Sequence, residues 1–155
     1  MKKNVFLFVL CSCISLYSFA QNMNNVPTKG AQVLPNGWHK FQLQGVVFDV
    51  EIADRVFVKG NIKWFDGATY SGSLGSKGIS GRGTYTWPNG EKYEGSSRNN
   101  MRHGKGTMYY KDGTKFSGKW RENKQHGKGK LFDANGVVVK TGTWKMGTFI
   151  NKKDR

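Results

Sequence analysis

The side chains best suited to metal or acid–base chemistry in this chain of 155 residues are three histidines and ten acidic residues. His103 and His126 are 23 residues apart, a period at which several other residue types recur. If each period forms a two-stranded unit, the two imidazoles lie about 10 Å apart, too far to share one ion, and no recurring carboxylate accompanies them. We therefore expect both histidines to be structural, with no metal and no cofactor bound.

The acidic residues do not form the pairs that general acid–base catalysis needs in a cleft. Asp66 and Asp112 each precede a glycine, and Asn89 and Asn135 take the equivalent positions, so the carboxylate is dispensable there and the side chain forms a turn. The glutamates share no repeat position: Glu91, Glu94 and Glu122. We predict no catalytic residues and no enzyme. The alternative, a hydrolase or lipid-modifying enzyme, would need a cleft lined by acids or histidines.

The basic residues form a recurring pattern of their own. Lys59, Arg82, Lys105 and Lys128 follow one another at 23-residue intervals, in a chain of net charge +15. On neighbouring units this row of cations has a spacing of about 10 Å, and two further lysines broaden it: Lys115 and Lys119. Near an anionic membrane each such charge contributes about 1 kcal/mol. The row is therefore a candidate site for an anionic lipid or polysaccharide surface, and the alternative is a face that only keeps the protein soluble.

The elements that carry these residues are predicted from turn dipeptides with the same period: Asp66-Gly67, Asn89-Gly90, Asp112-Gly113 and Asn135-Gly136. Asp-Gly or Asn-Gly between alternating apolar runs indicates a β-hairpin with a tight turn, whose two central residues both take positive φ. The other link in each unit, such as residues 98–102, is predicted to be longer. The fold class is therefore all-β, an elongated antiparallel β-meander of 23-residue hairpin repeats in a single twisted sheet.

Strand alternation assigns the two faces of this sheet. One face carries the recurring aromatic residues, which are a second candidate binding surface: Trp64, Tyr70, Trp87, Tyr93, Phe116 and Trp120. Recurring glycines on the same face leave room for the rings to lie over the neighbouring backbone: Gly72, Gly83, Gly95, Gly106, Gly118 and Gly129. An exposed aromatic row could stack on sugars or on an extended peptide. The alternative is a core closed by curvature and by the N-terminal segment.

Two units resemble a known repeat. Their pattern is an aromatic residue, any residue and glycine, followed after a gap by His-Gly-x-Gly; it occurs as Tyr93-Glu94-Gly95 with His103–Gly106, and as Phe116-Ser117-Gly118 with His126–Gly129. This pattern is similar to the MORN repeat (membrane occupation and recognition nexus), and the resemblance extends over residues 60–149. The unit that begins at Tyr70 departs from it, with serine in place of histidine, and the last unit is shifted by one residue. The resemblance implies a module for protein assembly or membrane association, without catalysis.

The N-terminal segment predicts the cellular location of the protein. Residues 1–20 are a predicted signal peptide, with two lysines, a short apolar run and a Ser-x-Ala ending cleaved after Ala20. Both cysteines lie in this segment, and lipidation of Cys13 is the alternative to cleavage. Residues 21–36 are predicted to be a polar linker, 37–59 an N-terminal β cap or degenerate repeat, and 150–155 a basic tail. Cleavage removes two lysines and no acid, which lowers the net charge from +15 to +13.

These observations predict an exported, non-catalytic interaction or scaffold module at the cell envelope, located in the periplasm, on the outer surface or in the medium. Its expected partner is a protein or an anionic membrane or polysaccharide surface. A polyanion binder that acts through the basic row alone is the alternative. Nucleic acid suits the charge but not the expected export.

Overall fold

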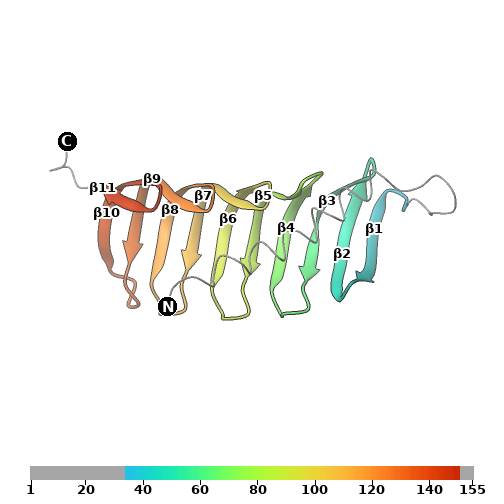
Figure 1. The fold of residues 1–155 in the computed structure, drawn as a ribbon, viewed down its shortest axis with the longest axis horizontal. Helices are drawn as coiled ribbons and strands as arrows, with labels where there is room; N and C mark the ends of the chain where they lie inside the picture. Colours follow the sequence, from blue (N-terminus) through green and yellow to red (C-terminus); the bar gives the residue numbers. More distant parts are fainter. Residues whose placement is uncertain (1–33, 151–155) are drawn as a thin grey trace.

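The computed structural model of the protein describes residues 34–150, and in them eleven β-strands form one antiparallel sheet in which every strand pairs with its neighbours in the sequence. Figure 1 shows the strands side by side along an elongated sheet, with β1 at one end and β11 at the other. The strands are β1 (Gly37–Leu43), β2 (Val46–Ala53), β3 (Val56–Lys63), β4 (Thr69–Gly75), β5 (Gly78–Thr86), β6 (Lys92–Arg98), β7 (Met101–Tyr109), β8 (Lys115–Arg121), β9 (Lys124–Phe132), β10 (Val138–Lys145) and β11 (Thr148–Ile150).

The predicted all-β meander is therefore confirmed. The predicted signal peptide, the lipidation alternative at Cys13, nearly all of the linker and nearly all of the basic tail lie outside the described residues. Between residues 34 and 150, no helix has the length and apolar character that crossing a bilayer requires.

The prediction for the turns was wrong, because the two kinds of link are exchanged. The loop at Asp66-Gly67 has three residues between Trp64 and Ala68, closed by a hydrogen bond from the Trp64 amide to the Ala68 carbonyl (3.0 Å). Within it, the Gly67 amide donates to the Trp64 carbonyl (3.0 Å), and Gly67 has φ 90° while Asp66 is not in the left-handed region. This is the three-residue hairpin loop in which only the glycine must take positive φ. The Asp66 carboxylate instead accepts from the Ala68 amide (2.9 Å).

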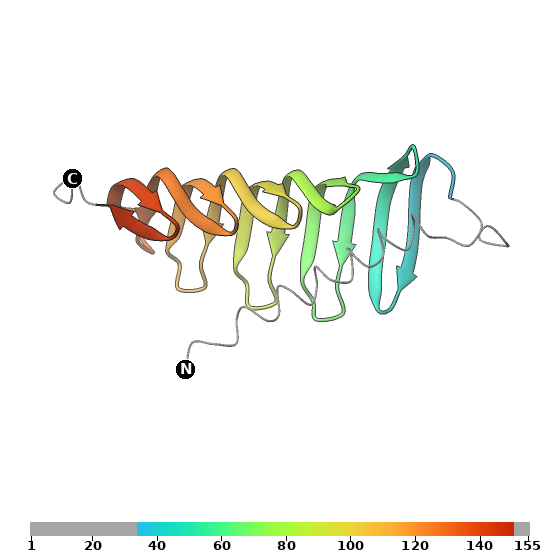
Figure 2. The same cartoon turned by 45° about the horizontal axis from the view of Figure 1, so that its top comes forward.

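The other links are the two-residue turns. Asn99 (φ 49°) and Asn100 (φ 64°) join β6 to β7, and Glu122 (φ 50°) and Asn123 (φ 67°) join β8 to β9. Asparagine tolerates this conformation better than most residues. Asn100 also binds the preceding hairpin, because its amide donates to the Ile79 carbonyl (2.9 Å) and its side-chain oxygen accepts from the Ile79 amide (2.7 Å). Figure 2 shows these turns following one another along the upper edge of the sheet.

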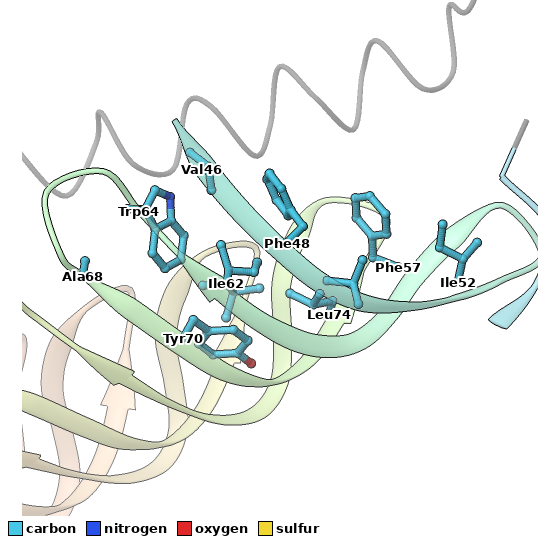
Figure 3. Close-up of a cluster of buried hydrophobic side chains, with 11 residues drawn as sticks. Val46, Phe48, Ile52, Phe57, Ile62, Trp64, Ala68, Tyr70 and Leu74 are labelled. Carbon is cyan, nitrogen blue, oxygen red and sulfur yellow. The ribbon is translucent and has the colours of Figure 1, made fainter. Parts of the chain in front are cut away.

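Residues 37–59 continue the same sheet, since they form β1, β2 and the start of β3. Along β2 the alternation of buried and half-buried residues is complete, and the buried side chains are Val46, Phe48, Val50 and Ile52. They join Ile62, Trp64 and Tyr70 in the first of two buried apolar clusters. In Figure 3 the labelled side chains of this cluster gather on one side of the curved strands.

The second cluster lies toward the C-terminal end of the sheet and is mainly aromatic. It consists of Tyr93, Met108, Phe116, Trp120 and Trp144. Phe116 is fully buried, and its ring meets the rings of Trp120 and Trp144 edge-on at centroid distances of 5.3 Å and 5.0 Å. Such edge-to-face contacts add to the stabilisation that comes from burying the rings.

Candidate functional site: a basic groove across the polar face

The polar face of the sheet is hollowed into an open groove of about 930 Å³. The residues that line it come from β5, β6, β7, β8, β9 and β10, so the groove runs across the strands and not along them. Three of the predicted basic row line it, Arg82, Lys105 and Lys128, and Lys119 lines it with them. A smaller hollow of about 350 Å³ lies further toward the N-terminus on the same face, and Thr84 belongs to both.

The cations of the groove face polar or basic residues on the adjacent strands. Lys105 of β7 lies directly opposite Lys119 of β8 in the register of the sheet. Arg82 pairs with Ser96, and the partner of Lys128 on β10 is Thr143. Like charges directly opposite one another destabilise an antiparallel pair. The Lys105–Lys119 pair therefore has an electrostatic cost that a bound anion would relieve.

Glu94 is the acid among the described residues that line the groove, and it already has partners. Lys92 forms an ion pair with it (2.7 Å), and the Tyr109 hydroxyl donates to its other oxygen (3.1 Å). The hydrogen bond from Lys92 holds the pKa of the Glu94 carboxyl below its usual value. The charge of Glu94 is thus balanced by Lys92, and it does not neutralise Lys105, Lys119 or Lys128.

Hydroxyl-bearing residues line the groove beside the cations, and Thr84, Thr107 and Ser117 are called its hydroxyl floor. A single register line crosses the sheet from Thr84 through Glu94, Thr107 and Ser117 to Lys130. Thr107 donates a hydrogen bond to the Ser117 hydroxyl (3.0 Å). At one side, Phe132 adds an aromatic ring to the lining, and the Lys115 ammonium lies 4.7 Å from its centroid. Cations, hydroxyls and one aromatic ring therefore meet in a single groove.

Lys59, the fourth member of the predicted row, lies apart from the groove. Its ammonium forms an ion pair with Glu51 (3.0 Å) and lies 5.8 Å from the ring of Trp38. Its register partners are Glu51 on β2 and Ser73 on β4, and the residues that line the groove begin at β5.

The aromatic face has a different character, because five of its six predicted binding residues are buried: Trp64, Tyr70, Tyr93, Phe116 and Trp120. Trp87 alone of the six is half-buried, and it packs against the second cluster. Burial raises the pKa of the Tyr70 and Tyr93 hydroxyls to about 12. The five buried rings serve the core of the sheet and present no surface to a partner.

The recurring glycines allow this packing. A Cβ atom at Gly129 would lie 2.5 Å from Cζ of Phe116, and one at Gly95 would lie 2.6 Å from the Tyr93 hydroxyl oxygen. Gly118 and Gly129 are also direct partners in the register, so the Phe116 ring covers two glycines at once. On the opposite side, the backbone of these glycines opens into the groove.

The MORN repeat family model matches three consecutive segments of the chain, residues 76–92, 93–115 and 116–138. Residues 76–138 are three consecutive MORN repeats. The register explains the match, since each segment from residue 93 onward holds one aromatic-x-Gly strand and the following Gly-x-Gly strand. The hairpins of residues 60–75 and 139–149 lie outside the matched segments but continue the same sheet. No curated protein matches the chain.

Within the second MORN repeat, Arg102 takes a position that sequence reasoning missed. Its guanidinium lies 4.6 Å from the Trp120 ring and within 6 Å of the Trp87 and Tyr93 rings. It also donates to the Asn123 carbonyl (3.1 Å), and burial lowers the pKa of the guanidinium. Arg102 lies opposite Ser97 in the register, so a long side chain fills the space beside a small one. It belongs to the aromatic face and not to the groove.

The histidines of the MORN repeats are both half-buried. Over residues 34–150 the structure brings together no group of three histidine, cysteine or acidic side chains that could hold a metal ion. Nδ1 of His126 is buried and has no hydrogen-bond partner among the described residues. The equivalent position of the first repeat is Ser80, whose hydroxyl accepts from the Asn99 amide (3.2 Å).

Proposed function

We propose that this protein is a non-catalytic interaction module that holds an anionic partner in the basic groove of its MORN-repeat sheet. The observation that carries the proposal is the set of cations in the groove that no described carboxylate neutralises, Lys105 opposite Lys119 above all. Five exposed cations in one hollow raise the local positive potential and attract a polyanion: Arg82, Lys105, Lys119, Lys128 and Lys130. MORN repeats suggest a repeat-based interaction module, which agrees with this role.

A non-catalytic role is proposed because of the composition of the groove. The described residues that line it include one acid, Glu94, and no histidine, so general acid–base chemistry has no second group to work with. The carboxylate of Glu94 already forms an ion pair with the Lys92 ammonium and accepts a hydrogen bond from the Tyr109 hydroxyl. A hydrolase of the kind considered from the sequence would need a second acid or a histidine within reach.

The binding proposal is tested by removing the row of cations. The triple variant Arg82→Gln/Lys105→Gln/Lys128→Gln is expected to bind dextran sulfate about 10- to 100-fold more weakly, since each lost charge contributes up to about 1 kcal/mol. Its salt dependence is also expected to be shallower, because fewer counterions are released on binding. Fluorescence anisotropy with labelled dextran sulfate at two salt concentrations measures both.

The matched control carries the same change of charge away from the groove. Lys77→Gln/Lys111→Gln/Lys124→Gln alters three exposed lysines that do not line it. This control is expected to retain most of the affinity of the parent protein. Equal weakening by the two triple variants would mean that net charge alone drives binding, and no binding by the parent protein would overturn the proposal.

We further propose that the module is exported, on the basis of the lysines, apolar run and Ser-x-Ala ending within residues 1–20. The expected result is a mature protein that begins at Gln21, found by intact mass measurement of the protein in the periplasm or the medium. A mature protein that begins with a diacylated Cys13 would instead establish a lipoprotein. A chain that keeps Met1 and stays in the cytoplasm would contradict export.

A further inference from the structure

The cations of the basic groove have a defined spacing along the sheet. Arg82, Lys105 and Lys128 lie on β5, β7 and β9, so one strand separates each from the next. Neighbouring strands lie about 4.8 Å apart, which places successive cations about 10 Å apart along the groove. A ligand that meets all three therefore extends across the strands and presents an anion at about this interval.

This spacing does not suit a peptide in the β conformation. In that conformation the side chains on one face recur every two residues, or about 6.6 Å, so acidic residues on that face do not match the interval of the cations. The strands beneath the groove already pair on both sides, which leaves their backbone no free edge for a peptide to add to. Whatever binds here is held by side chains.

The hydroxyl floor and the Phe132 ring add a second requirement for the ligand, which concerns its chemistry and not its spacing. Thr84, Thr107 and Ser117 can exchange hydrogen bonds with a ligand rich in hydroxyl groups, and Phe132 can pack against an apolar ring face. Sugar rings have both features, and two linked sugar rings are about as long as the interval between successive cations.

We infer that the basic groove binds a linear acidic polysaccharide that carries one anionic group per disaccharide. The chain lies across the strands, with one carboxylate or sulfate at each of Arg82, Lys105 and Lys128. Lys119 lies between the last two and contacts the same polymer. This inference rests on the proposed function and adds the chemical class of the ligand.

Hyaluronan oligosaccharides test the spacing, because hyaluronan carries one carboxylate per disaccharide. Isothermal titration calorimetry is expected to show an affinity that rises about fivefold with each disaccharide up to the hexasaccharide, then levels off when the three cations are occupied. Trigalacturonate carries three carboxylates at half the spacing, which suits Lys105, Lys119 and Lys128 on adjacent strands but leaves Arg82 without an anion. The Arg82→Gln variant is therefore expected to bind the hexasaccharide about fivefold more weakly and to bind trigalacturonate as the parent protein does. Cellohexaose, a neutral chain of the same length, controls for contacts that need no charge.

Two variants separate sugar recognition from charge. Thr84→Val keeps the shape of the floor and removes one hydroxyl, and it is expected to weaken the hyaluronan hexasaccharide severalfold and to weaken inorganic polyphosphate, a polyanion without sugar rings, much less. Lys105→Gln is expected to abolish the gain in affinity that the parent protein shows when the second disaccharide is added. The thermal midpoints of both variants should match that of the parent protein, since both positions lie on the solvated face.

The possible outcomes distinguish a failure of this inference from a failure of the proposed function. Groove-dependent binding of dextran sulfate, with a hexasaccharide affinity that Arg82→Gln leaves unchanged, would overturn the inference of one anionic group per disaccharide and leave the proposed function standing. Groove-dependent binding to phosphatidylglycerol vesicles without any binding of oligosaccharides would overturn it in favour of a membrane surface. No binding of any anionic probe would overturn both.

Discussion

Replacing Gly129 by alanine is expected to lower the free energy of unfolding by about 2–3 kcal/mol through overpacking. The new Cβ would lie 2.5 Å from Cζ and 2.7 Å from Cε2 of Phe116. Phe116 cannot yield easily, because it is fully buried and the Trp120 and Trp144 rings meet it edge-on. Chemical denaturation followed by tryptophan fluorescence measures the change.

Gly75→Ala is the matched control. Gly75 is also in a strand and has no positive φ, but its nearest heavy atom to an added Cβ is the Ser80 Cβ at 3.4 Å. Its substitution is expected to change stability by less than about 1 kcal/mol, since alanine there restricts the unfolded chain without a clash. Equal losses for Gly75→Ala and Gly129→Ala would contradict the packing role of the glycines.

A double-mutant cycle identifies the neighbour responsible. If the loss at Gly129 comes from the Phe116 ring, then Gly129→Ala in a Phe116→Ala background should be nearly neutral. The coupling energy should then approach the full loss of the single Gly129→Ala variant. Additive losses would place the strain in the backbone of the adjacent strand, where the Gly118 Cα lies 3.3 Å from the added atom.

Trp120→Ala is expected to have the largest effect on stability, a loss of about 3–5 kcal/mol. The indole is buried, its Nε1 donates to the Gly106 carbonyl (3.0 Å), and its ring contacts both Tyr93 and Phe116. It also lies beneath the Arg102 guanidinium, which would lose its nearest aromatic ring. The substitution thus opens a cavity and leaves a half-buried charge less well packed.

Trp38→Ala removes the same side chain from the other end of the sheet and serves as the control. Trp38 is 54% exposed on the edge strand β1, so its loss is expected to change stability by about 0.5 kcal/mol or less. Urea denaturation of both variants compares them directly. A Trp120→Ala protein as stable as Trp38→Ala would contradict the assignment of Trp120 to the core.

The sequence predicted the sheet and its faces because both follow from local chemistry. A 23-residue period in glycine, aromatic and basic residues can be satisfied only by repeated units, and side chains alternate between the two faces of a strand. The turns were a harder case. Asp-Gly suits the two-residue turn as well as the three-residue loop, because both contain a glycine with positive φ. Which loop forms depends on the register of β3 with β4, a pairing between strands that the dipeptide does not specify.

For the candidate site too, some features follow from the sequence and others only from the structure. The sequence determined that Arg82, Lys105 and Lys128 recur on the polar face, because period and alternation are properties of the chain itself. Only the tertiary structure decided that the Lys59 ammonium pairs with Glu51, that Lys119 faces Lys105, and that Arg102 turns to the aromatic face over Trp120. These contacts join residues on different strands, and the irregularity between Gly95 and Ser97 shifts the register beside Arg102. Curvature and register arise from the packing of all the strands together, so no local segment of the sequence contains them.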